Sequence, residues 1–79
     1  MVVIHRARGF RFVIYRSDHE PAHVHVIGAG QARINLLGPG GAPAVVWSAG
    51  INRGDLRRLI AETIELRGVF LQEWKRIHG

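Results

Sequence analysis

The segment "HEPAHVHV", residues 19–26, gathers the side chains of this sequence that are best suited to chemistry. Three of the five histidines fall within seven residues, with Glu20 and Pro21 between them. Imidazoles bind transition metals and exchange protons near neutral pH. The same spacing fits a strand whose polar face carries histidines. A metal site, a catalytic cluster and a polar strand face are therefore the three interpretations to be weighed.

The metal interpretation depends on the two-residue spacing of His23 and His25. Side chains two apart on a strand leave the same face about 6.6 Å apart, so both imidazoles could reach one zinc or nickel ion. A third ligand would come from His19, Glu20 or His5, whereas Arg33 would repel a cation. We predict no bound metal and no other cofactor. The candidate ligands, should a metal bind, are His19, His23 and His25.

The catalytic interpretation pairs His23 or His25 with Asp18 or Glu20 as an orienting acid. The chain has two serines and no cysteine, so few residues could act as a covalent nucleophile. Small metal-independent ribonucleases nevertheless work with histidine, arginine and tyrosine side chains alone. We expect a protein that is not an enzyme, we assign no catalytic residue, and we keep such a ribonuclease as an alternative.

The elements that must position these residues follow from the hydrophobic pattern. Residues up to 51 alternate with a period near two and are interrupted by glycines, a pattern typical of short strands. The tight turn "GAG" at 28–30 predicts a hairpin between the strands that flank it. We predict an antiparallel sheet of four to five short strands within residues 2–48. The expected strands span 2–7, 10–16, 23–27, 31–37 and 44–48.

Residues 52–78 repeat instead at the helical period, and Asn52 fits a helix N-cap with Asp55 at the third helical position. One unbroken helix of about 26 residues would be roughly 39 Å long, against about 30 Å for a compact domain of this size. We therefore expect a kink or break near Arg67 and Gly68. The predicted fold class is α+β, with the sheet covered on one face by the C-terminal helix, in a single domain over residues 1–79.

This arrangement predicts which side chains stay outside. If Val24 and Val26 face the helix, His23 and His25 lie on the opposite face of the sheet. The two tryptophans, Trp47 and Trp74, are assigned to the core because each can bury a large apolar area. The predicted binding surface is cationic and consists of Arg11, Tyr15, His23, His25, Arg33 and Asn35.

The charge balance indicates which classes of partner the chain could bind. Eleven basic residues face six acidic ones, and ten of the eleven are arginine. The guanidinium fork matches phosphate and carboxylate groups, so the balance favours a nucleic acid or an acidic protein surface. No apolar run reaches the roughly 20 residues that span a bilayer, so no membrane role is expected. The absence of cysteine fits a cytoplasmic protein, which we expect to be a monomer or a homodimer.

Several motifs carry a family resemblance over nearly all of the chain. The pattern "HRARGFRFVIYRSDHEPAHVHVIG", then "VVWSAGINRGDLRRL" and a closing "EWKRIHG", resembles the small prokaryotic family catalogued as domain of unknown function 4160. Its most specific part is the Glu-Pro-x-His-Val-His-Val core that begins at Glu20. The family typically has a second proline where this chain has Ala22. The resemblance implies a compact α+β module without an assigned activity.

Such families occur in mobile or defence-related gene neighbourhoods, including toxin–antitoxin pairs, and phages use modules of this size as inhibitors of CRISPR complexes. Together with the basic surface, this association predicts a small binding module that acts by occupancy on a nucleic-acid-handling protein partner, as an anti-CRISPR inhibitor or a toxin–antitoxin component would. A transcriptional regulator that binds DNA or RNA is the alternative. The small ribonuclease is the second alternative.

Overall fold

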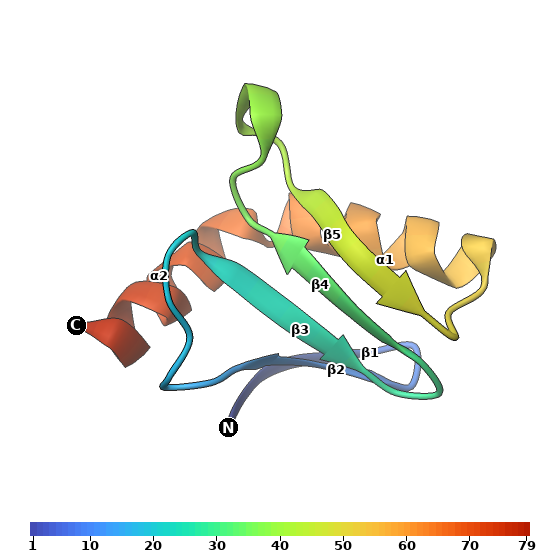
Figure 1. Cartoon of the computed structure of the whole chain (residues 1–79), viewed down its shortest axis with the longest axis horizontal. Coiled ribbons are helices and arrows are strands. Elements are labelled where there is room, and N and C mark those ends of the chain that lie inside the picture. Colours follow the sequence, from blue (N-terminus) through green and yellow to red (C-terminus); the bar gives the residue numbers. More distant parts are fainter.

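The first two thirds of the chain form one antiparallel sheet in which every strand pairs with its neighbours in sequence. The computed structural model describes all 79 residues. The strand order is β1-β2-β3-β4-β5, so β1 and β5 are the edges. Figure 1 shows this sheet in front of the two helices. The strands are β1 (Val2–Ala7), β2 (Phe10–Ile14), β3 (His23–Ile27), β4 (Gln31–Asn35) and β5 (Ala44–Ala49).

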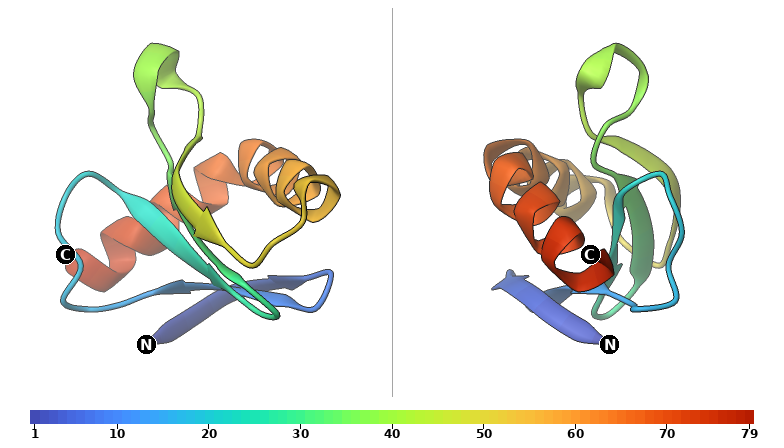
Figure 2. Two further views of the ribbon diagram at one scale, coloured as in Figure 1. Left: turned by 45° about the vertical axis from the view of Figure 1, so that its right-hand side comes forward. Right: turned by 90° about the vertical axis from the view of Figure 1, so that its left-hand side faces the viewer.

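The two helices, α1 (Arg53–Glu65) and α2 (Arg67–His78), cover one face of the sheet (Figure 2). The Asn52 side chain caps α1 by accepting a hydrogen bond of 2.8 Å from the Asp55 backbone N–H. The helices meet at Leu66, whose backbone departs from helical geometry at φ −99° and ψ 12°. The α+β fold and the broken C-terminal helix are confirmed. A short 3₁₀ turn, η1 (Pro39–Gly41), lies between β4 and β5.

The break divides the helical layer into two helices that are short enough to lie on the sheet. The molecule measures 34 × 28 × 19 Å, which leaves no room for an unbroken helix of about 39 Å lying along the sheet. Arg67 also anchors the start of α2, because its guanidinium donates a hydrogen bond to the Gly41 carbonyl oxygen. Neither helix combines the length and apolar character needed to span a membrane.

The core lies between the sheet and the helices. Val24 and Val26 are fully buried there, as the alternation predicts, and Leu59 of α1 and Phe70 of α2 pack against the same cluster. The aromatic pair Phe12 and Phe70 is in contact across the layers, with ring centroids 5.4 Å apart. The buried cluster consists of Phe10, Phe12, Ile14, Ala22, Val24, Val26, Ala32, Ile34, Leu36, Leu59, Phe70 and Trp74.

The assignment of both tryptophans to the core is wrong for Trp47, which is 43% exposed. Arg33 pairs with Trp47 and Ile34 with Val45, so Val46 is an extra residue that forms a bulge in β5. Because Trp47 lies opposite Arg33 in the register, it is on the face of the sheet that the helices do not cover. Trp74 is buried, as predicted.

Leu59→Ala should lower the free energy of unfolding by about 2–5 kcal/mol, because the cavity would open in the only layer between sheet and helix. Ile64→Ala is the matched control, since Ile64 lies on the same helix and is 54% exposed. It should change the stability by less than about 0.5 kcal/mol. Urea unfolding followed by circular dichroism measures both, and equal losses in the two variants would contradict the packing described.

Candidate functional site

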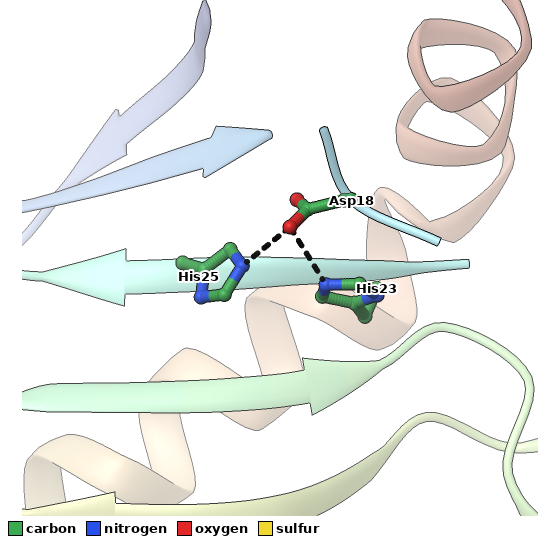
Figure 3. A group of neighbouring side chains, drawn as sticks. All are labelled: Asp18, His23 and His25. Carbon is green, nitrogen blue, oxygen red and sulfur yellow. Dashed lines mark hydrogen bonds and ion pairs between the residues drawn. The ribbon is translucent and has the colours of Figure 1, made fainter. Parts of the chain in front are cut away.

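The loop between β2 and β3 folds back over the sheet face that the helices leave free. Figure 2, in its right-hand view, places this loop on the side of the sheet opposite the helices. It brings Asp18 above the first residues of β3, where His23 and His25 point toward it (Figure 3). One ligand atom from each of these three residues lies within 4.8 Å of the others. We call these residues the Asp18 cluster.

Asp18 is held by both of its carboxylate oxygens. Oδ2 accepts a hydrogen bond of 2.9 Å from the Tyr15 backbone N–H, which closes the turn after β2. Oδ1 lies 3.4 Å from Nε2 of His23 and 3.3 Å from Nε2 of His25. Burial raises the pKa of this carboxyl, but the Tyr15 N–H, the His25 hydrogen bond and the charges of both imidazoles outweigh that effect and hold it below its ordinary value. Asp18 is therefore a carboxylate at neutral pH.

His23 is the buried member of the cluster, with only 1% of its surface exposed. Its Nδ1 lies 2.8 Å from the Pro21 carbonyl oxygen, so Nδ1 carries the hydrogen and donates it. Arg33 Nη2 also approaches Nδ1, at 3.5 Å, but a guanidinium can only donate, and the much shorter contact decides the tautomer. In the neutral ring, Nε2 is then a bare acceptor, and it has no hydrogen-bond partner.

His25 is the accessible member, with 22% of its side chain exposed. Its ring meets the edge of Tyr15 at a centroid distance of 4.9 Å and that of His23 at 5.0 Å. These aromatic contacts hold the imidazole beside Asp18 while leaving part of it in contact with solvent. The cluster is thus an ordered group of one anion and two imidazoles at the protein surface.

The predicted cationic surface needs one correction. The register places Arg11 opposite Ile27 and His25 between Val13 and Arg33, so the predicted residues do share the outer face. His23, however, is not available on a surface, because the loop covers it and the Trp74 ring lies 5.1 Å away. Alternation along a strand predicts on which face of the sheet a side chain lies, but it does not predict which loop covers that face. The other five, which are Arg11, Tyr15, His25, Arg33 and Asn35, are partly exposed.

The residues predicted to join the two histidines lie elsewhere in the fold. His19 is exposed and outside the cluster, and His5 instead forms a 2.8 Å hydrogen bond with Glu62 of α1. Glu20 accepts a hydrogen bond of 3.0 Å from Nε1 of Trp74, so it attaches α2 to the loop. Asp18, which the sequence suggested only as an orienting acid, is the third member. The spacing Asp-x4-His-x-His was the available signal.

Arg11 of the predicted surface forms a second feature at the other end of the same strands, with two arginines that were not predicted there, Arg6 and Arg8. Arg6, Arg8 and Arg11 line a hollow of about 550 Å³ beside the β1–β2 turn, together with Ile27 and Gly28. None of the three arginines has an acidic partner, because the ion pairs of arginine in this chain are Arg58 with Asp55 and Arg76 with Glu73. We call this feature the arginine hollow.

Asp18→Asn should lower the free energy of unfolding at pH 7 by roughly 1 kcal/mol, because the Tyr15 N–H and the His25 ring N–H lose their charged acceptor. A folded pKa below the ordinary 3.8 means that the carboxylate stabilises the fold above that pH and loses this contribution as the pH falls through the folded pKa. The two proteins should therefore become equally stable in acid. Urea titrations between pH 7 and 3 in a chelating buffer test this, and a constant difference would contradict it.

The comparisons with known proteins agree with the resemblance seen in the sequence. No curated protein and no solved structure gives a significant match. Residues 9–75 match the family described as Domain of unknown function (DUF4160), and this segment contains the whole Asp18 cluster and all elements except β1 and the last residues of α2. Because the match covers most of the chain, the protein belongs to the DUF4160 family.

Proposed function

We propose that this domain is a non-enzymatic binding module that acts by occupancy on a nucleic-acid-handling protein partner, as an anti-CRISPR inhibitor or a toxin–antitoxin component would, in the cytoplasm. The observation that carries the proposal is the arginine hollow, which three arginines line and no acidic residue of the chain does. Arginine is the side chain that recognises carboxylates and phosphates through paired hydrogen bonds. An anionic surface of a partner would supply the missing charges.

The strand register supports this interpretation, because Arg6 of β1 lies directly opposite Arg11 of β2. Like charges at directly opposed positions destabilise a sheet. Both arginines are also on the outer face, where the core gains nothing from them. A pair that weakens the isolated fold is more readily explained by contact with an anion outside the chain.

Arg8 lowers the stability of the isolated fold in a second way, through its backbone conformation in the β1–β2 turn. It has a φ of +55°, and the following Gly9 has a φ of +78°, so the turn between β1 and β2 has two positive values, as a type I′ hairpin turn requires. Asparagine or glycine fits the first of these positions better than arginine does. The arginine therefore places a charge at the tip of the hairpin at some expense of stability.

The exposed apolar residues favour a protein partner over free nucleic acid. Val46 and Trp47 of the edge strand β5 are 50% and 43% exposed. Trp47 shares the outer face with the arginines, through its pairing with Arg33. Aromatic residues and arginine are both enriched in protein interfaces, where a buried aromatic anchor is surrounded by polar contacts. A surface with these two components suits an acidic protein that itself binds nucleic acid.

Arg8→Glu should weaken partner binding at least tenfold, about 1.4 kcal/mol, because it reverses one of the three charges that line the hollow. Arg57→Glu is the matched control, since Arg57 is an exposed arginine on α1 and the change in net charge is the same. Cross-linked capture from host cells with each protein, followed by titration of the identified partner, measures both. Equal binding by the two variants would remove the hollow from the interface.

The same purified proteins distinguish the proposed function from the two alternatives, a transcriptional regulator and a small ribonuclease. A regulator would bind free DNA or RNA, and its association constant would fall steeply with salt as counterions are released. A ribonuclease would cleave RNA, and His25→Ala would abolish cleavage in a protein that still folds. Tight binding of an identified protein, with weak binding of oligonucleotides and no cleavage, supports the proposed function.

Arg8→Asn should separate stability from binding. Asparagine tolerates the positive φ at the turn, so the free energy of unfolding should rise by roughly 0.5–1 kcal/mol. Partner affinity should fall, because the guanidinium is lost. Urea unfolding and partner titration on the same protein measure the two effects, and a variant that is less stable than the wild type would contradict the strain argument.

A further inference from the structure

We propose that Asp18, His23 and His25 form a binding site for one divalent transition metal ion of the zinc class. The three residues come from two segments that meet only in the folded chain, the β2–β3 loop and strand β3 (Figure 3). The proposal goes beyond the binding function described above and does not depend on it. It rests on the contact between His23 and Asp18.

That contact sets two acceptors against each other. The Nδ1–H of His23 donates to the Pro21 carbonyl oxygen, so Nε2 of the neutral ring presents a lone pair. The atom that it faces is Oδ1 of the ionised Asp18, at 3.4 Å. His23 is buried and its Nε2 has no hydrogen-bond partner. A proton or a metal ion can lie between such a buried ring nitrogen and a carboxylate, and the third ligand atom beside them, Nε2 of His25, points to a metal ion.

The two distances from Asp18 to the imidazole nitrogens fit such an ion, and all three ligand atoms lie within 4.8 Å of one another. Ligand atoms about 2.05 Å from zinc, at the tetrahedral angle, lie ~3.3 Å apart. Oδ1 of Asp18 lies 3.3 Å from Nε2 of His25 and 3.4 Å from Nε2 of His23. Three protein ligands of this kind leave a further coordination position for water or a group of a partner. Imidazole nitrogens favour zinc and related transition metals over magnesium, which prefers oxygen ligands.

The surroundings of the ligands are those of a supported metal site. A ligating histidine usually donates its second ring N–H to a backbone carbonyl or a carboxylate, and Pro21 provides that acceptor for His23. Asp18 is likewise fixed through Oδ2 by the Tyr15 N–H. Arg33 opposes a cation, but its guanidinium approaches Nδ1, at 3.5 Å, and not the Nε2 that faces Asp18. The charge of Asp18 offsets that of Arg33.

A metal bound here would attach the β2–β3 loop to the sheet. In its absence, Asp18 meets the two imidazoles only through contacts of 3.3 and 3.4 Å, which are long for hydrogen bonds. Ligation replaces them with coordinate bonds to the start of β3. The expected effect is a more stable fold and a fixed loop above His23, with no change required in the arginine hollow.

The test is a zinc titration of the chelator-treated, dialysed chain, followed by calorimetry and thermal unfolding. The wild type should bind one zinc ion per chain, and its melting temperature should rise by about 10–20 °C when free zinc is 100 times the dissociation constant. Magnesium should produce no rise. Asp18→Asn and His25→Ala should weaken zinc binding more than about 100-fold, since even the loss of an outer hydrogen-bond partner costs 10–100-fold.

His19→Ala is the matched control, because His19 is the residue next to Asp18 in the same loop and lies outside the cluster. It should bind zinc as the wild type does. Nitrogen NMR of the unmutated chain avoids any doubt about folding, and zinc should shift Nε2 of His23 and His25 while leaving His19 and His78 unchanged. Zinc that fails to stabilise the wild type, or that binds equally well after His25→Ala, would overturn the proposal. Partner capture is a separate experiment, so each proposal can fail alone.

Discussion

The ionised carboxylate of Asp18 is the contact on which the outer face of this domain depends. A loop of eight residues, 15–22, connects β2 and β3, and it contains three charged residues and an exposed histidine that would otherwise keep it in solvent. Asp18 binds the backbone at Tyr15 and faces both imidazoles of β3, which holds the loop against the sheet. Because the loop is held there, it buries His23 and brings Asp18 next to the two histidines.

Trp74 makes the complementary contact from the helical layer. It is buried in the core, it donates a hydrogen bond to Glu20, and its ring packs near His23. One side chain therefore ties α2, the loop and the first residue of β3 together. The break at Leu66 matters for this reason, since it lets α2 take its own direction across the sheet and bring Trp74 to the end where the loop folds back. The helix break, which chain length alone predicts, is thus also part of the site.

Much of the fold could be predicted because each element carries its own local signal. Val24 and Val26 alternate with the histidines, and Asn52 caps the helix with the hydrogen bond that its spacing to Asp55 suggests. The burial of His23 could not be predicted in this way, since it depends on where a loop without periodicity comes to rest. Trp47 is exposed because β5 is an edge strand with a bulge. The alternation of residues before Trp47 predicts neither the bulge nor the edge position. The missed residues are those whose surroundings come from distant parts of the chain.

The two ends of the outer face differ in whether a carboxylate of the chain lies beside the positively charged groups. Near the start of β3, the domain supplies its own anion, because Asp18 faces the imidazoles of His23 and His25. Near the end of β3, Arg6, Arg8 and Arg11 line one hollow that contains no carboxylate. Two of these arginines, Arg6 and Arg11, face each other directly across the strands, so their mutual repulsion is relieved when an external anion binds between them.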